Sequence, residues 1–166
     1  SEIARSGFAG IFLTAAAASH RIFGNTIFSN GAAGVYSDDP AADANRIEAN
    51  TIRGPGQAYG VQIQSGDRNV VTNNSQIARN TFYGVLLSAS ASSNRVAANT
   101  IFSNARAGVY ITNAAADANR VFANSIYGPG QARGVAVVDG NRNVFSNNII
   151  SGNTNGVLLT NSAASN

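Results

Sequence analysis

The sequence repeats itself after 74 positions, and this repeat restricts the possible folds more than any other feature. Residues 1–74 align with residues 75–148 without a gap, and about 43 of the aligned positions are identical. The stretch NRIEANTIRGPGQAYGVQI, which begins at Asn45, returns as NRVFANSIYGPGQARGVAV from Asn119. Self-similarity at a fixed period predicts an array in which each unit packs against its neighbours.

A shorter unit of 23 to 26 residues lies within the long repeat. An isoleucine or valine opens each unit, at Ile22, Ile47, Val70, Val96, Val121 and Val144. A glycine followed by an apolar residue closes each unit, at Gly10, Gly34, Gly60, Gly84, Gly108, Gly134 and Gly156. These positions define seven units, of which the first is partial.

The apolar residues inside a unit alternate with a period of two, as in Val61 and Ile63, which predicts short strands and not helices. Each unit has room for about three such strands. Parallel pairing of each strand with its equivalent one unit along would satisfy the backbone and wind the chain into a coil of rungs about 4.8 Å apart. We therefore expect the opening residues to form one inward column. A second inward column is expected from Val35, Val61, Val85, Val109, Val135 and Val157.

Asparagines recur where two strands of a unit must meet at a corner. One set is Asn25, Asn50, Asn73, Asn99, Asn124 and Asn147. A second set, at another corner, is Asn45, Asn94, Asn119 and Asn143. Asparagine tolerates left-handed backbone dihedrals, and amides stacked at the rung spacing can bond to one another. The sequence therefore predicts asparagine ladders along the coil.

The pattern NRVAANTIFSNARAGVYI resembles the right-handed parallel β-helix repeat. That repeat is shared by pectate-lyase-like proteins, carbohydrate-binding and sugar-hydrolase modules, and periplasmic copper-binding accessory proteins of nitrous oxide reduction. The resemblance implies an all-β fold, a right-handed single-stranded parallel β-helix (solenoid) of about seven rungs. It covers one domain, 1–166, made of copies 1–74 and 75–148 and a partial third copy, 149–166. The repeat hosts lyases, hydrolases, epimerases, adhesins and spacers, so it does not define an activity.

The composition excludes several classes of protein. The chain has no cysteine, which rules out disulfides and cysteine metal sites, and its net charge is +3. The arginines are spread along the chain and form no cluster in the sequence, so no nucleic-acid partner is expected. No apolar run is long enough for a transmembrane helix, so no membrane insertion is expected.

The acidic residues offer one candidate site. Asp38 and Asp39 are the only adjacent carboxylates. With Asp43 they form the acidic cluster of a carbohydrate-binding hypothesis, in which Arg46 lies nearby. The 74-residue repeat replaces the pair with a threonine and an asparagine, which favours a solvated loop instead. We assign no catalytic residue, no metal site and no cofactor.

Three further features have structural interpretations. His20, the only histidine, corresponds to Asn94 in the repeat and is expected at a corner. The two GPGQA segments lack the lysine of a phosphate loop and predict tight turns. Each of three aspartates precedes an arginine by three positions, which predicts local ion pairs, in Asp43-Arg46, Asp117-Arg120 and Asp139-Arg142.

Aromatic residues follow the inward positions and are expected to point outward, at Phe23, Phe28, Phe102, Phe122, Tyr127 and Phe145. Such rings could be covered by protein or could stack on sugars, and we favour cover by protein. A flat ice-binding or mineral-binding face is disfavoured, because threonine does not recur on every rung.

The sequence starts within a rung and stops at Asn166 without an apparent cap, which suggests a segment of a longer coil or rungs that join copies end to end. We therefore expect a structural repeat protein, a rigid extracellular or cell-surface spacer or fibre-forming segment. Its partners would be copies of itself or further rungs. The alternative is a carbohydrate-binding or carbohydrate-active β-helix, extracellular or periplasmic, with a polysaccharide partner; an enzyme of this kind would be a polysaccharide lyase or glycoside hydrolase.

Overall fold

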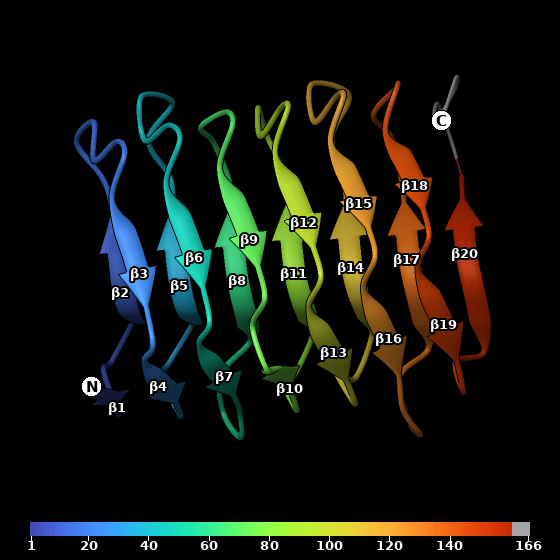
Figure 1. Cartoon of the computed structure of the whole chain (residues 1–166), viewed down its shortest axis with the longest axis horizontal. Helices are drawn as coiled ribbons and strands as arrows, with labels where there is room; N and C mark the ends of the chain where they lie inside the picture. The colour runs from blue at the N-terminus through green and yellow to red at the C-terminus, as the bar shows by residue number, and fades with distance from the viewer. Residues whose placement is uncertain (161–166) are drawn as a thin grey trace.

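The computed structural model describes residues 1–160, in which twenty short strands wind into a solenoid (Figure 1). The strands form three parallel sheets, two of seven strands and one of six. The rungs follow one another from the N-terminus at the left of Figure 1 to the last described rung at the right. The all-β parallel solenoid expected from the sequence is confirmed.

Each sheet takes one strand from every rung. Sheet I consists of β1 (Glu2–Ala4), β4 (Thr26–Phe28), β7 (Thr51–Arg53), β10 (Gln76–Ala78), β13 (Thr100–Phe102), β16 (Ser125–Tyr127) and β19 (Ile149–Ser151). Sheet II consists of β2 (Ala9–Leu13), β5 (Ala33–Ser37), β8 (Tyr59–Ile63), β11 (Tyr83–Leu87), β14 (Ala107–Ile111), β17 (Arg133–Val137) and β20 (Asn155–Leu159). Sheet III consists of β3 (Arg21–Phe23), β6 (Arg46–Glu48), β9 (Val70–Thr72), β12 (Arg95–Ala97), β15 (Arg120–Phe122) and β18 (Val144–Ser146).

Like residues stack in register inside the coil. In sheet I, Ile27 pairs with Ile52, which pairs in turn with Ile77 through the parallel ladder, and all three are fully buried. In sheet II the valine column expected from the sequence is present, as in the pair of Val61 with Val85. Branched aliphatic side chains from neighbouring rungs thus form one continuous core, whose burial drives the winding.

The predicted inward column of opening residues, which lies in sheet III, is wrong at two positions. Ile47 pairs with Val71 and not with Val70, which lies instead in the outward row opposite Arg46. In the same way Val121 pairs with Phe145, which packs against the core, while Val144 is exposed. Both rungs begin with two apolar residues in succession, so hydrophobicity alone does not fix which one points inward.

The first asparagine ladder exists, but its members in two rungs are shifted by one residue from those predicted. Asn50 donates from its backbone N–H and its Nδ2 to Oδ1 of Asn74, at 2.9 and 3.1 Å, so Asn74 and not Asn73 belongs to the ladder. Asn148 likewise replaces Asn147. The left-handed conformation falls on the residue before the ladder amide, with φ of 52° at Asn73 and 54° at Asn147. The turn and the ladder are therefore built by two successive residues.

The second ladder is confirmed and includes Asn69, which accepts from the backbone N–H of Asn45 at 2.8 Å. His20 occupies the corner expected for it, where its backbone N–H donates to Oδ1 of Asn45 at 2.8 Å. A third ladder was not predicted, and it runs through Asn30, Gln57, Asn80, Asn104, Gln131 and Asn153. Its two glutamines belong to the GPGQA turns. Those turns place each glutamine 27 residues after the preceding ladder amide.

The glycine that closes each unit from Gly10 to Gly134 is required by close packing. A Cβ on Gly60 would lie 2.5 Å from Cγ2 of Ile77 and 2.5 Å from the carbonyl oxygen of Gly84. Neither the buried isoleucine nor the backbone of the next rung can move away cheaply. The recurrent glycine-valine pair therefore marks the place where the isoleucine column of sheet I packs closely against sheet II.

Candidate carbohydrate-binding face

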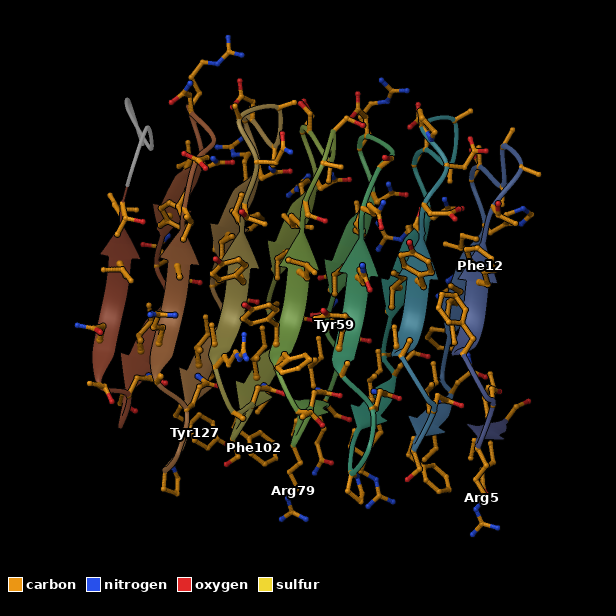
Figure 2. All side chains as sticks on the ribbon, turned by 180° about the vertical axis from the view of Figure 1, so that it is seen from behind. Arg5, Phe12, Tyr59, Arg79, Phe102 and Tyr127 are labelled. Carbon is orange, nitrogen blue, oxygen red and sulfur yellow. The ribbon has the colours of Figure 1, made fainter. Side chains whose placement is uncertain are left out.

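Rings collect on the outer side of sheet II, where Figure 2 shows Phe12 and Tyr59. We call this surface the aromatic face and define it by Phe8, Phe12, Tyr36, Tyr59, Phe82, Tyr83 and Tyr110. The residues lie in strands of sheet II or directly before them. Because parallel strands keep their register from rung to rung, rings that share a position in the repeat come to lie side by side.

The N-terminal part of the aromatic face is the more exposed. The Phe12 and Tyr36 rings are stacked at 5.2 Å, and Phe8 meets both of them edge-on. Phe8 and Phe12 are 50% and 45% exposed. The Tyr36 hydroxyl and Oε1 of Gln64 are 2.6 Å apart in a hydrogen bond. Apolar ring surface and a hydrogen-bonding amide thus lie next to each other.

The central part spans three successive rungs. Tyr83 stacks on Tyr110 at 4.4 Å with ring planes 3° apart, and Tyr59 stacks on Tyr83 at 5.9 Å. Phe82 packs beside Tyr59, and the guanidinium of Arg106 lies 4.4 Å from the Phe82 ring centre. This arrangement combines flat apolar surface, hydroxyl groups and a cation at one edge.

Two tyrosines of the aromatic face, Tyr36 and Tyr110, have raised pKa values and are neutral at ordinary pH. Burial, and then the charge of Asp38, raises the pKa of Tyr36. Burial also raises the pKa of Tyr110, with a further contribution from Tyr83, although the nearby Arg133 acts in the opposite direction. The hydroxyl groups are therefore suited to hydrogen bonding with a ligand and poorly suited to losing a proton.

Two edges of the solenoid carry different sets of charged side chains. Five arginines flank the turns from sheet I to sheet II, Arg5, Arg53, Arg79, Arg106 and Arg133. Within residues 1–160 these five form no ion pair. All six aspartates lie in the turns from sheet II to sheet III, Asp38, Asp39, Asp43, Asp67, Asp117 and Asp139. These five arginines, which look scattered in the sequence, therefore line one edge, where Figure 2 labels Arg5 and Arg79.

The acidic cluster suggested by the sequence does not converge on one point. Asp38, Asp39 and Asp43 lie in the turn between β5 and β6, where Asp39 accepts from the backbone N–H of Ala41. Asp43 accepts from the backbone of the next rung, whereas Arg46 binds Glu48. Residues 1–160 contain no group of three or more acidic, histidine or cysteine side chains that could hold a metal.

The predicted ion pairs Asp43-Arg46 and Asp117-Arg120 are wrong, because both aspartates pair with arginines of the next rung. Asp43 pairs with Arg68 at 2.7 Å and Asp117 with Arg142 at 3.1 Å, so each aspartate binds an arginine of the next rung. Arg46 and Arg120 are close to these aspartates in the sequence, but they are not their partners in the structure. In a solenoid, residues about 25 positions apart are the nearer neighbours.

The predicted outward aromatics are on the surface, with one exception. Phe145 points into the core in register with Val121. Phe23 and Tyr127 are 53% and 39% exposed, so described residues do not cover them as we expected. Phe102 and Tyr127 are stacked along sheet I with their ring centres 5.3 Å apart. Figure 2 labels both residues.

The sequence reasoning missed the aromatic face itself. Its signal is the recurrence of tyrosine next to the closing glycine-valine pair, after it at Tyr36 and Tyr110 and before it at Tyr59 and Tyr83. Aligning the units on that pair brings the rings into two neighbouring rows.

Residues 9–166 match the family described as the right-handed beta helix region, and the chain belongs to that family. Two similar solved structures are a single and a double mutant of the periplasmic alginate epimerase AlgG. They are 21% and 20% identical, with TM-scores of 0.74 and 0.73. In both cases 96% of this chain is covered but only 37% of the other. A comparison with curated proteins found no match.

Proposed function

We propose that this protein is a carbohydrate-binding β-helix whose aromatic face holds an acidic polysaccharide. The observation that supports this most directly is the stacked row of Tyr59, Tyr83 and Tyr110, beside arginines without an ion pair in residues 1–160. The likeness to an alginate epimerase adds support, because alginate is an acidic polysaccharide. This replaces the spacer as the leading hypothesis.

The chemistry of the face suits an acidic sugar chain. Sugar rings offer C–H surface to aromatic rings and hydroxyl groups to neutral tyrosines. Guanidinium groups bind carboxylates through paired hydrogen bonds, and Arg106 and Arg133 lie at the edge of the face. The rows run along the solenoid axis, so a ligand lying across several rungs would meet similar groups at each one.

Epimerase-like or lyase-like chemistry would need a base within reach of the sugar ring. On the aromatic face the pKa values of Tyr36 and Tyr110 are raised, and residues 1–160 contain no group of three or more acidic, histidine or cysteine side chains. We therefore assign binding residues and no catalytic residue. An enzyme is a further hypothesis: incubation with alginate or pectin would then yield epimerised or unsaturated products. A location outside the cytoplasm, periplasmic or extracellular, accompanies this proposal.

A rigid spacer is the second candidate, and the three amide ladders favour it. They join successive rungs with buried hydrogen bonds, as between Asn74 and Asn99 at 2.8 Å. A stiff rod that also binds polysaccharide would combine both functions. Electron microscopy of the protein at high concentration distinguishes fibres from isolated particles.

Binding can be tested by calorimetric titration with oligomers of galacturonate or alginate. We expect saturable binding that weakens as salt is raised, and a loss of at least about tenfold, or roughly 1.4 kcal/mol, in Tyr83→Ala with Tyr110→Ala. The matched control is Phe102→Ala with Tyr127→Ala, which removes a similar stacked pair from sheet I.

The control should bind like the parent protein. Equal losses in the two double variants would refute the role of the aromatic face. No binding to any acidic oligosaccharide would refute the proposed function, and equal binding of single-stranded DNA would show that charge alone is recognised.

A further inference from the structure

A row of arginines crosses sheet III, the sheet nearest the viewer in Figure 1. The parallel register places Arg21 opposite Arg46, and Arg95 opposite Arg120. Val70 separates the two pairs, because it pairs with both Arg46 and Arg95. Like charges directly opposite on neighbouring strands, about 4.8 Å apart, repel each other. Each pair therefore needs a negative charge nearby or loses stability.

The first pair has that charge within the protein. Glu48 accepts from Nε of Arg21 and, at 2.5 Å, from Nη2 of Arg46. The hydrogen bonds from Arg46 and then Arg21 hold the pKa of Glu48 below its ordinary value. One carboxylate thus bridges two guanidinium groups on adjacent rungs.

The second pair, Arg95 and Arg120, has no such carboxylate among residues 1–160. Phe122 occupies the position that corresponds to Glu48, 74 residues later, and the guanidinium of Arg95 lies 5.1 Å from its ring centre. Arg95 and Arg120 are both exposed, and neither forms an ion pair within residues 1–160. In the first copy, a carboxylate therefore lies between the two arginines. In the second copy, the backbone holds the two equivalent arginines without this carboxylate.

We propose that Arg95, Arg120 and Phe122 form a binding site for the carboxylate of a sugar acid. The ligand carboxylate would take the place that Glu48 has in the first copy, where paired guanidinium groups match its geometry. The half-buried Phe122 ring would contact the sugar ring. The site belongs to a different sheet from the aromatic face, so either can exist without the other.

The two copies provide reciprocal variants for the test. Phe122→Glu introduces the internal carboxylate and should close the site, and Glu48→Phe should open an equivalent site at Arg21 and Arg46. Both changes put a residue where the other copy already has it, so both proteins should fold, as far-ultraviolet circular dichroism will check.

The measurement is a titration with sodium galacturonate that follows the Nε–Hε signals of the arginines by NMR. In the parent protein, Arg95 and Arg120 should shift saturably while Arg21 and Arg46 stay unchanged. Phe122→Glu should weaken binding by at least about tenfold, and Glu48→Phe should make all four signals respond.

Four results would overturn the proposal, and three of them concern galacturonate and galactose. These are no saturable shift in the parent protein, an unchanged response in Phe122→Glu, and equal shifts with neutral galactose. A response to inorganic sulfate without one to galacturonate would also refute it. Failure here leaves the aromatic face untouched, because polysaccharide binding there is tested by variants of sheet II.

Discussion

Replacing Asn74 by alanine should destabilise the protein strongly, whereas the same change at Asn73 should not. The Asn74 side chain accepts two hydrogen bonds from Asn50, at 2.9 and 3.1 Å. It also donates to the carbonyl oxygen of Ile47 at 3.0 Å and to Oδ1 of Asn99 at 2.8 Å. All four bonds are buried, and Asn74→Ala removes them together.

The magnitude follows from the number of bonds. A buried hydrogen bond contributes about 1 kcal/mol net, and the groups left without partners add to the loss, so Asn74→Ala should cost about 4 kcal/mol or more. Asn73 is exposed with a φ of 52°, and alanine already occupies the equivalent left-handed positions at Ala49, Ala98 and Ala123. Asn73→Ala should therefore cost no more than about 1 kcal/mol.

The assay is urea unfolding of both variants, with stability compared through the midpoint at unchanged slope. We expect a large decrease in midpoint for Asn74→Ala and a small one for Asn73→Ala. Equal decreases, or a larger decrease for Asn73→Ala, would refute the assignment of the ladder to Asn74.

Other predictions concern packing and charge. Gly60→Ala should lower the thermal unfolding temperature sharply because its Cβ would meet the Gly84 backbone, and Gly7→Ala, with open space around it, should not. Ile77→Ala should cost about 2–5 kcal/mol in urea unfolding, since Ile77 is fully buried; a cost below about 1 kcal/mol would contradict its place in the core. Glu48→Gln should destabilise the protein above about pH 4.5, the ordinary pKa of the carboxyl. Its folded-state pKa is lowered, so this difference should vanish as pH falls through that lower value, and a difference independent of pH would contradict the ion pairs.

The repeat period was enough to predict the solenoid, because strands that recur in phase can all be satisfied by parallel pairing. It did not fix register where two equivalent residues are adjacent. Val70 and Val71 are both apolar, and Asn73 and Asn74 are both amides, so composition could not choose between them. Backbone geometry determines which asparagine joins the ladder, since the left-handed residue must come directly before the ladder amide.

Features that depend on neighbouring rungs were harder to predict. The partner of Asp43 lies 25 residues away, and the third ladder combines asparagine with glutamine across turns of unequal length. The aromatic face was missed because its tyrosines lie on either side of the closing glycine-valine pair. In each case the side chains meet only after the units have been wound on one another.

Mapping an acidic oligosaccharide onto the folded protein tests the functional account most directly. In an NMR titration with a galacturonate or alginate oligomer, we expect shifts concentrated on Tyr59, Tyr83, Tyr110 and Arg106, with Phe102 and Tyr127 of sheet I unchanged. Shifts centred on sheet I, or no shifts at saturating oligosaccharide, would contradict binding at the aromatic face.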